Sequence, residues 1–276
     1  MFNNLFSSGD PNLGLALGSG GARGLSHIGV IKALSAEGYQ VTHIAGSSIG
    51  ALVGGLYAAG HSVQDIEAIA ASMNWSRMGS LFFDPSFRRG LLRGKKIVTF
   101  LEEHLGDKTF ADCQVPFVAL ATDRHTGEAV ILNEGRLVDA IRASIAIPFI
   151  FDPLEYQGRE LIDGGVATPV PVQVVRDLGA TVVVAVNLDR YYHDQTVAPS
   201  WFDLINDALN ISRHHLAAAQ TATADVVLDI DAGRGWYDFI DSASCVVRGE
   251  EAMNEALPRL QMSYRQARPW WQRWYM

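Results

Sequence analysis

The stretch VTHIAGSSIG, residues 41–50, decides the fold because it joins a predicted strand to a predicted helix. Residues 41–46 have the β-branched and apolar composition of a buried strand. The residues that follow are rich in glycine and alanine, so a helix formed by them can pack closely against a sheet. Small residues around Ser48 also permit a sharp chain reversal. The stretch therefore predicts Ser48 on a strand-to-helix turn, in a G-x-S-x-G pattern.

An earlier segment repeats this order of strand and helix. Residues 13–18 (LGLALG) are a short apolar run that ends in glycine, which is typical of a buried strand. Apolar residues then recur every three positions from Leu25 to Leu34, as on one face of a helix, and Gly38 is a typical stop. Two successive units of this kind predict parallel strands in an α/β sheet.

The later part of the chain adds strands of both directions. A hairpin is predicted at residues 115–133, where two apolar runs flank Arg124-His125-Thr126-Gly127. Further strands are predicted at 181–188 and 224–230, and long helices at about 201–224 and 248–267. The predicted fold class is therefore α/β, with a mostly parallel but mixed sheet.

Composition limits the classes of protein that fit. With 276 residues and 48% hydrophobic residues, the chain is predicted to form one domain, 1–276, with its motifs at about 13–190 and a helical C-terminal part at about 200–276. A net charge of −8 argues against nucleic acid as a partner. The chain has no apolar run of 18 residues and no signal-like start, and Cys113 and Cys245 lack metal-ligand spacing. We expect a cytoplasmic protein.

A glycine-rich loop, GSGGARG at 18–24, follows the first predicted strand. Backbone N–H groups at such a helix start can converge on a negative charge. A dinucleotide site is disfavoured, since Arg23 stands where the third glycine is required and the second strand lacks a terminal Asp or Glu. If the first two strands are neighbours, the amides of Gly20 and Gly21 face Ser48 and can form an oxyanion hole.

A nucleophilic serine also needs a proton acceptor. The late histidines are His193 in a polar loop, and His214 and His215 in a helical pattern, where a solvated helix face is the simpler explanation, so none of them has a persuasive setting for a base. Asp163, in ELIDGG at 160–165, follows a short apolar run, although an aspartate before two glycines is usually a turn former.

Four blocks in this order resemble the patatin-like phospholipase family, and its compact bacterial members in particular. The blocks are GGARG at 20–24, GSSIG at 46–50, ASIAIP at 143–148 and DGG at 163–165. Together they are far more specific than any one of them. The resemblance spans about residues 13–190, and the C-terminal third adds little.

The resemblance implies a three-layer fold and a catalytic dyad without histidine. Ser48 is the implied nucleophile, and Asp163 activates it and later the attacking water. The implied oxyanion loop comprises Gly20, Gly21, Arg23 and Gly24, and the implied elbow is flanked by Gly46 and Gly50. Arg23 has three alternatives: it orients the loop, contacts a substrate phosphate or pairs with a carboxylate. Ser144 and Pro148 are expected to shape the pocket floor without a chemical role.

The expected function is a serine lipid acyl hydrolase that cleaves phospholipids or lysophospholipids through an acyl-enzyme. One alternative is a carboxylesterase or thioesterase that uses the same dyad on soluble acyl esters. Another is a non-catalytic regulator of this fold that binds lipid or protein. No cofactor and no metal are required by the chemistry, although the Asp-rich stretch at 228–233 leaves weak cation binding open.

Two segments suggest contact with a membrane. Residues 80–96 alternate aromatic or aliphatic residues with Arg and Lys, as in a lid or docking loop on anionic headgroups. The alternative is a loop whose aromatics fill the core. The C-terminal RPWWQRWYM, 268–276, suits a bilayer interface, a partner's groove, a subunit contact in a homo-oligomer or packing on its own domain. We expect peripheral association with the inner membrane surface.

Overall fold

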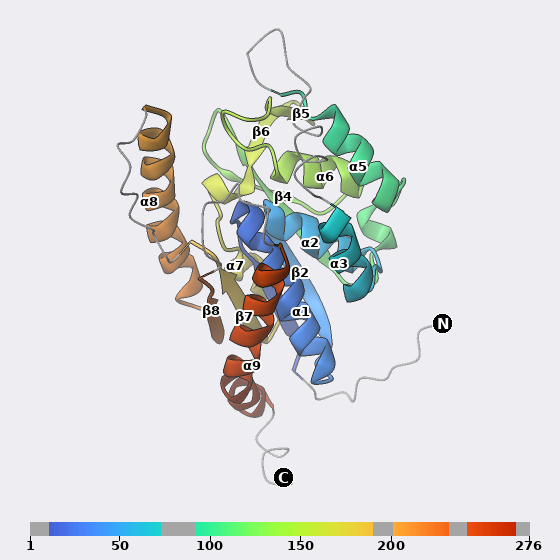
Figure 1. The fold of residues 1–276 in the computed structure, drawn as a ribbon, viewed down its shortest axis with the longest axis vertical. Helices are drawn as coiled ribbons and strands as arrows, with labels where there is room; N and C mark the ends of the chain where they lie inside the picture. Colours follow the sequence, from blue (N-terminus) through green and yellow to red (C-terminus); the bar gives the residue numbers. More distant parts are fainter. Residues whose placement is uncertain (1–10, 73–91, 190–200, 232–241, 269–276) are drawn as a thin grey trace.

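The computed structural model describes residues 11–72, 92–189, 201–231 and 242–268. These residues form a mixed sheet with helices on both faces (Figure 1). The strands are β1 Leu13–Leu17, β2 Val41–Ser47, β3 Phe117–Asp123, β4 Ala129–Leu132, β5 Leu154–Tyr156, β6 Arg159–Asp163, β7 Val182–Asn187 and β8 Val226–Asp229. The α-helices are α1 Ser26–Ala36, α2 Ile49–Ala58, α3 Val63–Ser72, α5 Lys95–Leu105, α6 Leu137–Ser144, α7 Val172–Asp177, α8 Trp201–Thr221 and α9 Ser242–Ala267. Short 3-10 helices are η1 Gly21–Leu25, η2 Phe110–Asp112 and η3 Gly164–Val166.

The sheet has the order β5-β6-β3-β2-β1-β7-β8, and β4 also pairs with β3. The five strands from β3 to β8 in this order are parallel to one another. Strands β4, β5 and β6 make the antiparallel pairs. The predicted α/β class and the mixed, mostly parallel sheet are therefore confirmed. The first two strands, β1 and β2, lie side by side, which is the condition that the expected oxyanion hole required.

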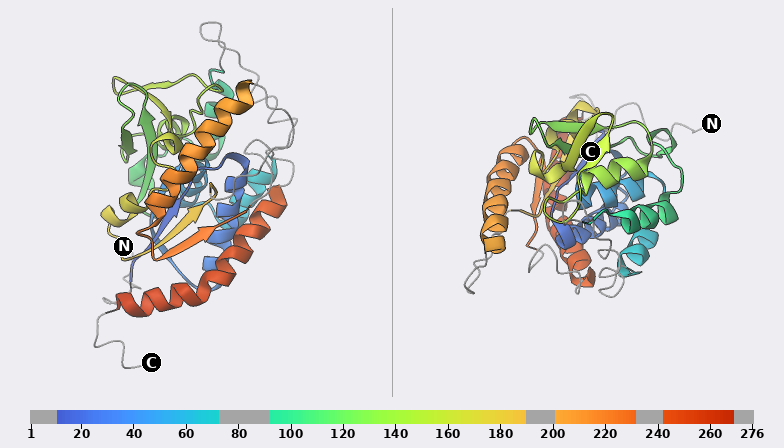
Figure 2. Two further views of the ribbon diagram at one scale, coloured as in Figure 1. Left: turned by 90° about the vertical axis from the view of Figure 1, so that its left-hand side faces the viewer. Right: turned by 90° about the horizontal axis from the view of Figure 1, so that it is seen from above.

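Helices cover both faces of the sheet. Figure 2 shows α8 and α9 on opposite sides of it. Helices α1, α2 and α9 pack over one face, and α7 lies against β1 and β2 on the other. Strand β1 is buried along its whole length, with the leucines of LGLAL on the α1 side and Ala16 on the α7 side. Burial on both faces explains why its sequence is continuously apolar instead of alternating.

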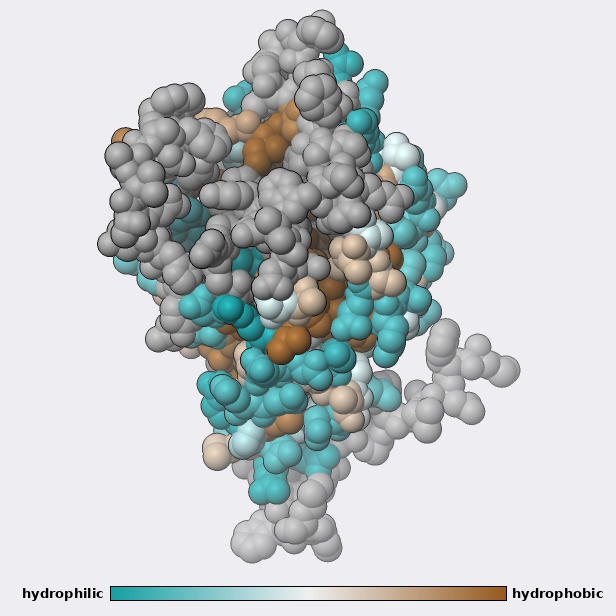
Figure 3. Space-filling model, viewed as in Figure 1, coloured by the Kyte–Doolittle hydropathy of each residue, from teal (hydrophilic) through white to brown (hydrophobic). Residues whose placement is uncertain are grey.

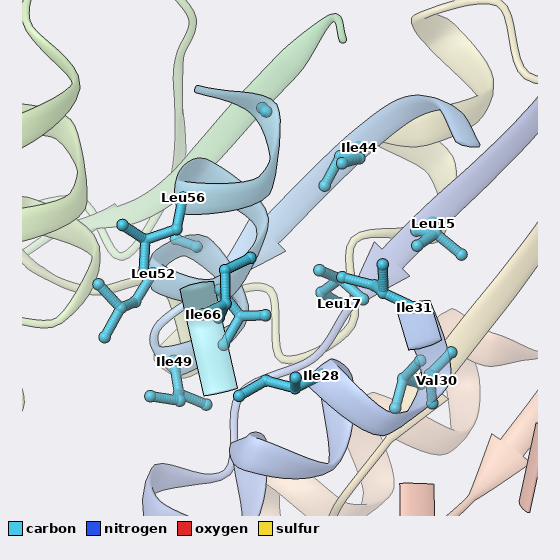
Figure 4. Close-up of a cluster of buried hydrophobic side chains, with 14 of the residues drawn as sticks. Leu15, Leu17, Ile28, Val30, Ile31, Ile44, Ile49, Leu52, Leu56 and Ile66 are labelled. Atoms are coloured by element: carbon cyan, nitrogen blue, oxygen red, sulfur yellow. The ribbon is translucent and has the colours of Figure 1, made fainter. Parts of the chain in front are cut away.

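The larger core cluster lies between the sheet and α1, α2 and α3. Figure 4 shows Leu15 and Leu17 of β1 beside Ile31 of α1, and Leu52 of α2 near Ile66 of α3. Each is less than a tenth exposed. Nearly all of α2 is buried, as its content of small residues predicts. This packing fixes the start of α2, and with it the turn that carries Ser48.

Helix α9 begins at Ser242, whereas the sequence predicted a start near 248. It runs along α1, and the added first turns bury Cys245 and Val246 against the core. The apolar periodicity of this helix is therefore set by a helix partner as well as by the sheet. Gly38, with φ 77°, ends α1 as predicted.

One face of the molecule shows hydrophilic and hydrophobic residues side by side (Figure 3). On the face seen in Figure 3, hydrophobic residues (brown) occur in the centre and upper part of the view, among hydrophilic ones (teal). Exposed large apolar side chains include Phe149, Leu204 and Ile211. Among the residues that the structure describes, no helix combines the length and apolar character needed to cross a bilayer.

Candidate active site

The ends of strands β2 and β6 meet on one edge of β3. Strand β2 ends with Ser47 opposite Leu120 of β3. One residue further along β3, Ala121 lies opposite Asp163, the last residue of β6. Strand β4 pairs with the same stretch of β3 and so occupies its other edge. Strand β6 therefore continues the row where β2 stops, and this register places Asp163 beside Ser48.

Ser48 stands on a strained turn between β2 and α2. Its backbone has φ 55° and ψ −123°, a region that side chains other than glycine rarely adopt. The backbone amide of Ser48 donates to Ser144 Oγ at 2.9 Å, and this hydrogen bond holds the turn in place. Because α2 begins at the next residue, the positive end of the helix dipole lies at Ser48. This is the local geometry that the G-x-S-x-G pattern predicts.

The glycines around Ser48 allow close backbone crossings. A Cβ at Gly50 would overlap the carbonyl oxygen of Leu17 at the end of β1, and one at Gly46 would overlap the backbone of Gly50. Both positions therefore require glycine for space.

Replacing Gly50 with alanine is expected to lower the free energy of unfolding by roughly 1–3 kcal/mol, the usual cost of overpacking. The added methyl group should also push α2 away from β1. Ser48 would then be displaced, and its labelling by a fluorophosphonate should fall. Gly127→Ala is the matched control, because that glycine has φ 76° but open space around it. Gly127→Ala should lower stability alone, and equal labelling of both variants would contradict the argument. Chemical denaturation and labelling rates measure the two effects.

Ser48 and Asp163 form a direct hydrogen bond inside the protein. Ser48 Oγ donates to Asp163 Oδ2 at 2.6 Å, and both residues are buried. Asp163 Oδ1 accepts from the Gly165 amide at 2.7 Å, which orients the carboxylate. Burial raises the pKa of Asp163 to about 6, and the hydrogen bonds from Ser48 and Gly165 oppose this shift. Above that pH the carboxylate is ionised and can accept a proton.

The two glycines after Asp163 do more than form a turn. A Cβ at Gly164 would overlap the carbonyl oxygen of Leu120 in β3. A Cβ at Gly165 would lie 2.6 Å from Cβ of Ser19 in the glycine loop. The DGG sequence therefore lets the end of β6 fit between β3 and that loop.

The glycine loop reaches the same place from the end of β1. Gly20 and Gly21 line a cavity together with Ser48 and Asp163. Gly21 begins η1, and the first N–H groups of a helix have no partner within it. The crevice predicted between the two turns is thus present. Gly24 lies further along η1, packed against Ile49.

Buried His27 anchors the start of this loop. Its Nε2 lies 2.7 Å from the carbonyl oxygen of Gly18, to which it donates. Burial lowers the pKa of His27 to about 4, so the ring is neutral at physiological pH. This histidine has no distinctive pattern in the sequence, because it falls on the apolar face of α1.

Arg23 fulfils two of its three alternatives. Its Nε donates to the Gly20 carbonyl at 3.2 Å, which orients the loop, and its Nη2 contacts Asp189 Oδ1 at 3.2 Å. Ser144 was expected to shape the pocket floor, but among the described residues that line the cavity it is not found, and its Oγ instead accepts from the Ser48 amide. Pro148 lines the cavity, as expected.

The cavity has a volume of about 180 Å³ and is open to the surface. Ser48 and Asp163 line it, and other lining residues come from α8. The α8 residues that line it are Leu209, Asn210, Ser212 and Arg213. Ile147 and Val166 supply apolar surface of the kind that an acyl chain requires.

The late histidines and the two segments considered for membrane contact either do not line the cavity or lie outside the described residues. His214 Nδ1 is 2.8 Å from the Asp189 carbonyl oxygen, and His215 stacks edge-on against His214. His193, most of the segment 80–96 and nearly all of the C-terminal RPWWQRWYM lie outside the described residues. Within the described ranges no cluster of three or more His, Cys, Asp or Glu side chains could hold a metal ion.

These features define an α/β protein with a serine on a strained turn, hydrogen-bonded to an aspartate and faced by a glycine loop. The family model for patatin-like phospholipases matches residues 15–176, which is more than half of the chain. The chain belongs to the patatin-like phospholipase family.

Similar proteins support this assignment. An uncharacterized NTE family protein of Mycobacterium tuberculosis is 43% identical over 183 residues, covering 66% of this chain and 50% of that protein. A lysophospholipase NTE1 of Yarrowia lipolytica is 32% identical over 200 residues, covering 71% of this chain and 14% of that protein. The chain thus spans about half the length of the first of these relatives. The crystal structure of VipD from Legionella pneumophila has a TM-score of 0.54 at 14% identity, covering 93% of this chain and 68% of VipD, and so shares the fold.

Proposed function

We propose that this protein is a serine hydrolase that cleaves carboxylic esters of phospholipids or lysophospholipids. The observation that carries the proposal is the hydrogen bond from Ser48 Oγ to Asp163 Oδ2, two residues that line the cavity. Family membership supports lipid ester hydrolysis as the class of chemistry. The name of the Yarrowia lipolytica relative favours a lysophospholipid among the lipid esters.

The first half of the reaction transfers the acyl group to Ser48. Ser48 Oγ bonds to the carbonyl carbon while its proton moves to Asp163 Oδ2. The carbonyl oxygen becomes an oxyanion, which the N–H groups of Gly20 and Gly21 stabilise together with the positive end of α2. The ester C–O bond then breaks, and the proton passes from Asp163 to the leaving alcohol.

The second half releases the fatty acid by the same groups. A water molecule gives a proton to Asp163 and its oxygen attacks the acyl carbon. The bond to Ser48 then breaks, and Ser48 Oγ takes the proton back from Asp163. Because a carboxylate is a weak base for a hydroxyl, proton transfer must accompany attack, and oxyanion stabilisation must supply much of the rate.

We further propose that the protein works at the surface of a membrane. Phe149, with half of its surface exposed, follows Pro148 at the cavity. Exposed apolar side chains near a lipid cavity favour contact with an interface. A cytoplasmic location and the inner membrane surface remain our expectation.

Purified full-length protein tests the proposal with two substrate forms. We expect it to release fatty acid from lysophosphatidylcholine and from phosphatidylcholine vesicles at rates above those on a soluble short-chain ester or thioester. Higher rates on the soluble esters would favour the carboxylesterase alternative. No turnover, together with no fluorophosphonate labelling of folded protein, would favour a non-catalytic lipid- or protein-binding regulator.

A further inference from the structure

A second carboxylate, outside the Ser48–Asp163 pair, joins the glycine loop to α8. Asp189 lies just after β7, and its side chain is 3% exposed. Its Oδ2 accepts from Ser19 Oγ at 3.1 Å. Its Oδ1 accepts from Nη2 of Arg23 at 3.2 Å and from Nη2 of Arg213 at 2.6 Å. One carboxylate therefore holds two residues of the glycine loop and one residue of α8.

The backbone around Asp189 is fixed as well. Its amide donates to Asn187 Oδ1 at 3.0 Å, and Asn187 Nδ2 donates to Asp229 Oδ1 at 2.8 Å. Its carbonyl oxygen accepts from His214 Nδ1 of α8 at 2.8 Å. Because side chain and backbone are both constrained, Asp189 is a rigid point to which the loop is attached.

From Asp189 the contacts lead through Arg23 to the glycine loop and through Arg213 to the cavity. Arg23 Nε donates to the carbonyl oxygen of Gly20, whose amide is a proposed oxyanion donor. Arg213 lines the cavity with Ser48 and Asp163. The described residues thus contain a continuous chain from the loop, through one buried ion cluster, to the wall of the cavity.

Building on the proposed hydrolase activity, we propose that Asp189 and Arg213 are positioning residues of this site. Asp189 holds the glycine loop so that the amides of Gly20 and Gly21 face Ser48, and Arg213 places its positive charge in the cavity that Asp163 also lines. Neither residue forms or breaks a bond in the reaction.

Stability alone is a poor explanation for the cluster. A buried ion pair adds little net stability, since removing the charges from water costs about as much as their attraction returns. Asp189 instead fixes the relative positions of three segments around the cavity, namely the glycine loop, α8 and its own segment after β7. Both residues also lie beyond 15–176, the range that matches the family model, so this part of the site comes from the C-terminal region of the chain.

The arrangement gives the two residues opposite electrostatic effects on Asp163. The charged groups that act electrostatically on Asp163 are Arg213 from α8, which lowers its pKa, and Asp189 after β7, which raises it. Asp189→Asn should therefore lower the pKa of Asp163, and Arg213→Gln should raise it.

The first measurement is the pH titration of the Asp163 carboxyl carbon by NMR, with the resonance assigned by its loss in Asp163→Asn. It needs no turnover, so it tests the inference even if the proposed function fails. Opposite shifts in Asp189→Asn and Arg213→Gln support the proposal, and shifts in the same direction, or none in both folded variants, overturn it. Arg213→Lys keeps the charge and should leave the titration close to that of the wild type.

The second measurement is hydrolysis by the same variants. We expect kcat to fall about 10- to 100-fold in Asp189→Asn with KM little changed, as for a misplaced catalytic group. Ser19→Ala removes one loop contact without a charge and should lower kcat with no shift of the pH profile. If Asp189→Asn does not fold, Ser19→Ala and the Arg213 variants decide, and unchanged kcat in Ser19→Ala and Arg213→Lys would overturn the proposal.

Asp225→Asn is the matched control for both measurements. Asp225 accepts from Arg176 Nη2 at 2.8 Å and lies just before β8, at the opposite end of the strands from Asp189. Its loss should reduce stability without altering kcat or the titration of Asp163. If the wild type hydrolyses no ester and is not labelled, the proposed function fails. The titration still tests whether Asp189 and Arg213 act on Asp163.

Discussion

Ser48→Ala is expected to abolish ester hydrolysis and fluorophosphonate labelling of the folded protein. Without the hydroxyl no acyl-enzyme forms, and loss of a serine nucleophile costs on the order of 10³- to 10⁶-fold in kcat. The α2 N-terminus and the glycine loop remain, so substrate should still bind. The fold should also persist, because alanine fits the space of serine. Fatty acid release, labelling followed by mass spectrometry, and thermal melts together measure these outcomes.

Ser47→Ala is the matched control for this variant. Ser47 is the preceding residue and is also buried, but its hydroxyl donates to the carbonyl oxygen of Thr168 and not to Asp163. Its loss should cost about 1 kcal/mol, a typical net hydrogen bond, and leave labelling intact. Labelling that survives in Ser48→Ala at another residue would place the nucleophile elsewhere and end the proposed mechanism.

The parts of the fold encoded by local sequence could be predicted. Strand β1 is an apolar run followed by glycine, β2 has many β-branched and apolar residues, and the helices after them have regular periodicity or small residues. Ser48 and Asp163 were predicted because four short motifs occur in a fixed order. Their contact could not be read directly, since it depends on the short antiparallel pairing of β6 with β3.

The residues that the sequence did not reveal make contacts between distant parts of the chain. Asp189 follows a strand and Arg213 lies in an amphipathic helix, where charged residues are ordinarily solvated. Only the folded chain brings both to the glycine loop, since Asp189 and Arg23 are 166 residues apart in the sequence. His27 was hidden for a related reason, because a buried histidine on an apolar helix face has no distinctive pattern.

Asp163→Asn is expected to lower kcat by on the order of 10²- to 10⁴-fold, the usual contribution of a general base. Asparagine retains the shape and can still accept from the Gly165 amide, but it cannot take the Ser48 proton. His215→Gln is the control, because that ring contacts His214 and not the Ser48–Asp163 pair. Nearly full activity in Asp163→Asn, or loss of activity in His215→Gln, would point back to a histidine base.

The pH dependence of the wild type follows from the same carboxylate. Burial raises the pKa of Asp163 to about 6, so only above that pH is the base free to accept a proton. The rate should therefore rise with pH through about 6 and then level off. An acid limb near the ordinary value of 3.8 would contradict the raised pKa of Asp163.

The raised pKa also predicts an unusual effect on stability. The folded state retains a proton on Asp163 between the unfolded pKa near 3.8 and the folded pKa near 6, so the stability from this group is complete below 3.8 and is lost as pH rises through 6. At pH 8 the wild type must bury a charge that asparagine lacks. Asp163→Asn should thus gain unfolding free energy relative to the wild type as pH rises from 4 to 8, while losing activity. Denaturant titrations of both proteins across this range measure the difference, and a difference that stays constant with pH would contradict the shift.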